Sequence, residues 1–115
     1  MPSLFEVSAG KLAGPTTGGT VTQATNKTTG VTLNAESGQI TMNDAALGAA
    51  AEASFTVTND KIAATDVVVA VHGSAGTAGS YLVGVSAIAA GSFGITVTNV
   101  SGGSLSEAIV INFVA

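Results

Sequence analysis

The sequence contains no cysteine and few of the side chains that catalytic sites need. Without cysteine, a disulfide framework, a thiolate metal site and a cysteine nucleophile are all excluded. Aromatic residues make up 4% of the chain and tryptophan is absent, so the chain has few platforms for a sugar ring. Charged residues make up only 9%, against about 25% in an average soluble domain. The surface must therefore consist mainly of Thr, Ser, Asn, Gly and Ala.

The remaining composition predicts a single globular domain. A length of 115 residues suits one domain with one core. The mean hydropathy of +0.54 favours collapse over disorder. The net charge of −4 disfavours binding to the phosphate backbone of nucleic acids. No targeting segment is visible at the N-terminus, and the longest apolar stretch, residues 62–71, is too short to span a bilayer.

The first 19 residues differ from the rest of the chain. They contain both prolines and several glycines, and their apolar residues follow no sustained period. We interpret residues 1–19 as an extended arm that packs on another molecule rather than forming an element of its own. The apolar side chains available for that contact are Leu4, Phe5, Val7 and Leu12.

From residue 20 to residue 115 the pattern predicts short β-strands. Phe55 and Val57 alternate with Thr56 and Thr58, which indicates one buried and one solvated face. Clusters of Gly, Asn, Asp and Ser separate such runs. The expected strands cover residues 20–25, 31–34, 38–42, 53–58, 66–72, 81–88, 93–98 and 108–114. About eight short strands at this spacing predict an all-β domain, an antiparallel β-sandwich or jelly roll.

Two of the expected strands are apolar on both faces, namely those around 67–71 and 109–114. Such strands lie centrally in a sandwich or press against a neighbouring subunit. Soluble monomers protect sheet edges with charged residues or proline, but no lysine falls inside an expected strand. We therefore expect a homo-oligomer. The residues expected in its interface or in the core are Val67, Val68, Val69, Val71, Ile109, Ile111 and Phe113.

Residues 43–52 allow a second interpretation. This segment is rich in alanine and begins with Asn43, a good helix-capping residue, so a short helix competes with a loop between strands.

Candidate catalytic residues are sparse. The single histidine, His72, could form a triad on paper with Ser74 and Asp66, but no nucleophile-elbow pattern supports it. Asp60 and Asp66 lack the spacing of a calcium loop, and we expect the aspartates to cap turns. The glycine-rich segment 73–79 fits neither a dinucleotide fingerprint nor a P-loop. We expect no catalytic, cofactor or metal site, and no enzyme activity.

Four segments of the chain resemble a family of small virion proteins of tailed bacteriophages. They are GGTVTQATNKTTGVTLN at 18–34, SGQITM at 37–42, IAATDV at 62–67 and SGGSLSEAIVINF at 101–113. The resemblance covers residues 18–113 and rests on structural rather than catalytic motifs. Similar modules occur as free-standing proteins of this length and as parts of longer phage appendage proteins.

The resemblance implies a capsid decoration (cement) protein. Such proteins are commonly trimers that bind the outer surface of the phage head at three-fold positions and clamp neighbouring major capsid protein subunits. The implied location is therefore the virion, after synthesis in the host cytoplasm, with no cofactor and no membrane or nucleic-acid partner. Two alternatives are a tail-fibre or appendage module that binds a host receptor, and a small hydrolase of host surface polymers.

Overall fold

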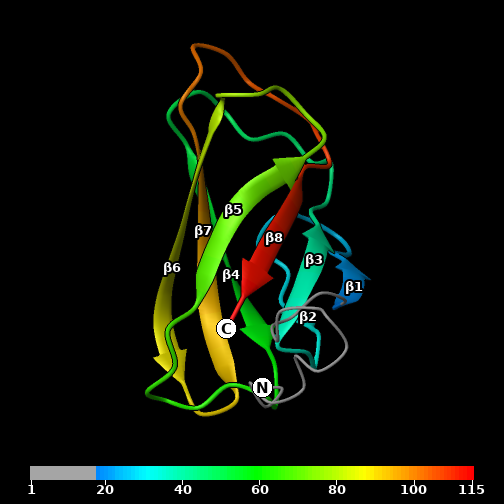
Figure 1. Cartoon of the computed structure of the whole chain (residues 1–115). Coiled ribbons are helices and arrows are strands. Elements are labelled where there is room, and N and C mark those ends of the chain that lie inside the picture. Colours follow the sequence, from blue (N-terminus) through cyan, green and yellow to red (C-terminus); the bar gives the residue numbers. More distant parts are fainter. Residues whose placement is uncertain (1–17) are drawn as a thin grey trace, which may run out of the picture.

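The computed structural model describes residues 18–115, which form eight strands in two facing sheets (Figure 1). Sheet A has the order β1-β3-β8-β5 and sheet B the order β2-β4-β7-β6. The strands are β1 Gly19–Thr22, β2 Val31–Thr32, β3 Ser37–Thr41, β4 Glu52–Thr58, β5 Val69–Ser74, β6 Tyr81–Ala89, β7 Ser92–Asn99 and β8 Val110–Val114. The predicted all-β sandwich is confirmed, and each expected strand has a counterpart.

The pairing is mixed rather than purely antiparallel. β1 pairs with β3 in parallel and β2 pairs with β4 in parallel, whereas the other pairs are antiparallel. In both parallel pairs the intervening strand lies in the opposite sheet, so the chain crosses the sandwich twice and returns in its original direction. A short hairpin cannot make such a connection, so these two pairs depart from the antiparallel pairing that the sequence predicted.

Strict alternation of side chains builds the core. In β4 and β7 every second residue points inward, so Phe55 pairs with Ile95 and Val57 with Phe93. These side chains are 0–4% exposed. From sheet A, Ile40, Ile111 and Phe113 meet them, and the rings of Phe93 and Phe113 lie 5.3 Å apart. The sandwich therefore has one continuous apolar core.

Residues 43–52 form no helix, so the helical alternative is wrong. Leu47 instead pairs with Leu105 through two backbone hydrogen bonds of 2.8 and 3.0 Å. The Leu47 side chain is 6% exposed and belongs to the core. A helix would need the backbone groups that bond to Leu105, and it would draw Leu47 out of the core. The described residues contain no helix that could span a membrane.

The strand expected at 66–72 begins three residues later and lies at the edge of its sheet, not in a central position. β5 starts at Val69 and forms the edge of sheet A, paired with β8 alone. A bulge follows His72, where the pairing with β8 shifts by one residue. One face of β5 is therefore exposed, and its free edge is turned toward the side of the sandwich where β6 forms the edge of sheet B (Figure 1).

A buried lysine fastens one end of the sandwich. Lys27 is 4% exposed, and its Nζ donates to the backbone oxygens of Asn43 and Glu107, the latter at 2.7 Å. Burial lowers the pKa of Lys27, while the nearby carboxylates of Asp44 and Glu107 oppose that shift. The ammonium thus joins three segments that are far apart in the sequence. Each buried side-chain nitrogen and oxygen of residues 18–115 has a hydrogen-bond partner.

Candidate functional site

The most prominent exposed feature is a group of valines on edge strand β5, just before it, and at the end of the adjoining strand β8. Val67 is 79% exposed, Val69 and Val71 are each 52% exposed, and Val114 beside them on β8 is 38% exposed. Val69 pairs directly with Val114. We call these four residues the valine surface. Clustered apolar side chains at the surface of a soluble domain mark sites of protein contact more often than scattered ones do.

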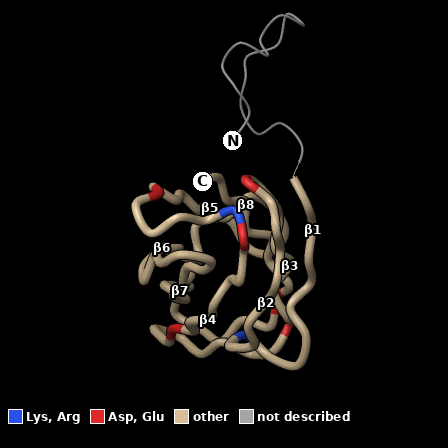
Figure 2. Tube along the Cα trace, turned by 90° about the horizontal axis from the view of Figure 1, so that it is seen from below, with Lys and Arg blue, Asp and Glu red and all other residues tan. Residues whose placement is uncertain are grey.

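The two strands that carry the valine surface, β5 and β8, contain no lysine, arginine, aspartate or glutamate. Among the described strands, only β4 carries a lysine, arginine, aspartate or glutamate, namely Glu52 at its first position, and β5 carries His72. The other described acidic and basic residues lie in the loops (Figure 2). Charged side chains are the usual protection of sheet edges. Both β5 and β6 are edge strands without that protection.

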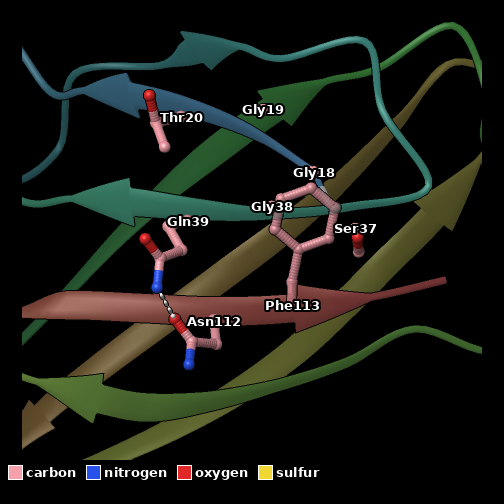
Figure 3. Close-up of a pocket in the computed structure, with 8 residues that line it drawn as sticks. All are labelled: Gly18, Gly19, Thr20, Ser37, Gly38, Gln39, Asn112 and Phe113. Atoms are coloured by element: carbon pink, nitrogen blue, oxygen red, sulfur yellow. Dashed lines mark hydrogen bonds between the residues drawn. The ribbon is translucent and has the colours of Figure 1, made fainter. Parts of the chain in front are cut away.

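The rest of the outer face of sheet A is polar but neutral. Gln39 on β3 donates from its Nε2 to the Oδ1 of Asn112 on β8, at 3.1 Å (Figure 3). At the end of this face lies a hollow of about 390 Å³. Its walls offer hydroxyl, amide and backbone groups, and come from Gly18, Gly19, Thr20, Ser37, Gly38, Gln39, Asn112 and Phe113. A Cβ atom at Gly38 would lie 2.8 Å from the Phe113 ring, so glycine permits this close packing.

In the hypothetical triad, the side chains of His72 and Asp66 bond to separate backbone groups. The Nε2 of His72 lies 2.6 Å from the Ala75 oxygen and 3.1 Å from the Ser74 oxygen, two acceptors that assign a proton to this nitrogen. The Oδ2 of Asp66 accepts from the Ala63 amide at 2.9 Å, which confirms that Asp66 caps a turn. His72 therefore anchors the loop after β5, and a hollow of about 330 Å³ lies between its ring, this loop and Tyr81.

Glu107 also holds this loop. Its carboxylate accepts three hydrogen bonds, from the Thr77 amide at 3.0 Å, the Thr77 hydroxyl at 2.9 Å and the Tyr81 hydroxyl at 2.7 Å. The Tyr81 bond, followed by those from Thr77, lowers the pKa of Glu107. Burial, the bond to Glu107 and its negative charge raise the pKa of Tyr81. The His72 and Tyr81 rings also meet edge to face, 5.4 Å apart.

This arrangement predicts a loss of stability in acid. Because the folded state lowers the pKa of Glu107, its contribution is present above the unfolded value of about 4.3 and disappears as the pH falls through the folded value. We expect the urea midpoint to decline between pH 5 and pH 3, and Glu107→Gln to remove part of that decline. Glu52→Gln, at an exposed position of β4, serves as the control. Equal pH profiles for Glu107→Gln and the wild type would contradict this role.

The structure places the sequence-predicted residues in two groups. Val68, Ile109, Ile111 and Phe113 are core residues, 0–7% exposed, whereas Val67, Val69 and Val71 are exposed. The predicted capsid-contacting residues Leu4, Phe5, Val7 and Leu12 lie outside the described residues, so their role stays a prediction. Within residues 18–115, no three His, Asp or Glu side chains are grouped as metal ligands.

Sequence reasoning missed two features. Leu82 on β6 is 64% exposed, and the signal that could have found it is the absence of charge and proline from a nine-residue strand. Glu107 carried no recognisable motif for its contacts, because its partners lie 26 and 30 residues away.

Comparison with known proteins found no matching family model, no matching curated protein and no matching solved structure.

Proposed function

We propose that this protein is a capsid decoration (cement) protein of a tailed bacteriophage. In this proposal it binds the outer surface of the head as a homotrimer and stabilises contacts between major capsid protein subunits. Copies contact one another through the valine surface and β8, and the apolar residues of the N-terminal arm contact the capsid. The protein acts by binding and carries out no reaction.

The observation that carries the proposal is the exposed valine surface, on strands that carry no lysine, arginine, aspartate or glutamate. Val67, Val69 and Val71 are more than half exposed, although a monomeric domain gains nothing from displaying them. The proposal assigns these side chains to an interface, where their burial removes apolar area from water. The resemblance of residues 18–113 to phage virion proteins supports a location of this interface on the phage particle. A content of only 9% charged residues also suits a structural protein that is present in many copies.

Binding to heads can be tested with particles that lack this protein. We expect purified wild-type protein to bind them saturably and to raise the temperature at which the heads lose their DNA. Because few charges are available for screening, binding should survive molar salt. Loss of binding in salt would contradict the apolar nature of the contact.

The arm is tested in the same assay. A chain of 17 extended residues reaches about 60 Å, far enough to lie across a neighbouring capsid subunit. We expect deletion of residues 1–12 to leave a folded oligomer that no longer binds heads. A control that replaces the same residues with a Gly/Ser segment of equal length separates apolar contact from mere length. If either variant binds heads as the wild type does, the arm is not the anchor.

A further inference from the structure

The core of the sandwich is incompletely covered along β6. Val83 pairs with Val97 of β7, and Val85 pairs with Ile95. The two β7 side chains are fully buried, at 0% exposure, whereas Val83 and Val85 are only half-buried although they face the same interior. The inner side of β6 thus leaves apolar area in contact with water, which a second surface could cover.

β6 also has a free edge. It is the last strand of sheet B, nine residues long, and it contains neither proline nor a charged residue. Leu82 extends from its outer face with 64% of its area exposed. A long apolar edge of this kind is a template for contact with another chain.

The valine surface and β6 adjoin on one side of the molecule. β5 and β6 are the edge strands of the two sheets on that side, and His72 of β5 stacks edge to face on Tyr81 of β6 at 5.4 Å. Val69 and Val71 point outward from sheet A, whereas Val83 and Val85 point inward from sheet B. Since the two sets face different directions within one copy, they cannot cover each other.

We propose that the valine surface of one copy packs against the β6 side of the next copy, and that three such contacts close a ring. This inference rests on the homotrimer of the proposed function and identifies its two contacting surfaces. A contact between two different surfaces of identical chains is head-to-tail, and it closes into a ring when the rotation between copies permits. The predicted three-fold axis then runs beside β5 and β6, and leaves β1 and β2 on the outside.

Size and charge both suit a second copy as the occupant. The nine residues of β6 make this side of the molecule about 30 Å long. Its width is about 20 Å, which is the spacing of the two sheets together with the strands β5 and β6. The resulting patch of about 600 Å² in projection is of the order of the 800 Å² that each partner buries in a standard interface. Neither β5 nor β6 carries a lysine, arginine, aspartate or glutamate, and His72 of β5 already bonds to the backbone that follows it, so these strands bring no carboxylate, ammonium or guanidinium group into the contact.

The natural absence of cysteine permits a direct test. Val71→Cys and Leu82→Cys, both at exposed positions, are purified separately, exchanged into mixed oligomers, and treated with a short bis-maleimide crosslinker. We expect mixed dimers on denaturing gels from the Val71→Cys and Leu82→Cys combination. Val71→Cys with Thr56→Cys should give none, because Thr56 is exposed on β4, two strand positions from β6.

Three results of the crosslinking experiment would overturn the inference. They are crosslinks formed mainly between two Val71→Cys chains, equal crosslinking with Thr56→Cys, and intact oligomers that show no crosslink. A protein that is monomeric in solution yet binds heads would also overturn it, while leaving capsid binding itself intact. Failure to bind heads with the predicted crosslinks present would contradict the proposed function alone.

Discussion

Val68→Asp is expected to unfold the protein. Val68 is 7% exposed and belongs to the core, immediately before β5. An aspartate there would place a carboxylate among the apolar side chains of the core. Burying an unpaired charge is among the few single changes that cost more than about 4 kcal/mol. Because a domain of this size has a total stability of about 5–15 kcal/mol, the loss would be severe.

The neighbouring position provides a matched control. Val67 is 79% exposed, so the same substitution leaves its carboxylate in water. We expect Val67→Asp to weaken the proposed contact between copies but to leave the chain folded, since an exposed substitution usually changes the unfolding free energy of a single chain by no more than about 0.5 kcal/mol. Circular dichroism during urea titration measures both variants. If Val68→Asp were as stable as Val67→Asp, the described boundary between core and surface would be wrong.

Val71→Asp is expected to dissociate the oligomer without unfolding the chain. Val71 is 52% exposed and points away from the core, so an isolated copy tolerates the charge. At the proposed interface, three carboxylates would lose water in one assembly and gain no partner. Light scattering should give a mass near that of one 11.0 kDa chain, where the wild type should give about three times this value.

The control for Val71→Asp is Thr56→Asp on β4, which is exposed outside the proposed interface. It should remain oligomeric and bind heads. Persistence of the wild-type mass in Val71→Asp would exclude the valine surface from the contact between copies. If Val71→Asp were unfolded, position 71 would belong to the core, and the exposure described for Val71 would be wrong.

The run from Val67 to Val71 shows what the sequence could and could not predict. Alternation reveals which face of a strand is buried only when the two faces differ in polarity, as they do for Phe55 and Thr56. In a run of five apolar residues the alternation carries no such signal. The structure assigns Val68 and Ala70 to the core and leaves Val67, Val69 and Val71 exposed.

Features that depend on contacts between distant segments could not be predicted from the sequence either. The parallel pairs follow from the order in which the chain crosses between sheets, and no local motif encodes that order. The burial of Lys27 has no local signal, because lysine is rarely buried and one of its hydrogen-bond partners is a carbonyl 80 residues away. The eight strands, by contrast, were predictable because turn residues and short alternating runs are local signals.

Locating the protein on the virion tests the proposed function most directly. Electron cryomicroscopy of wild-type particles would be compared with particles whose gene for this protein is deleted. The proposal predicts difference density on the outer face of the head, at three-fold positions, with each unit accommodating three sandwiches in a ring. Density at the tail or fibre tip instead of the head would contradict capsid decoration and favour the receptor-binding alternative.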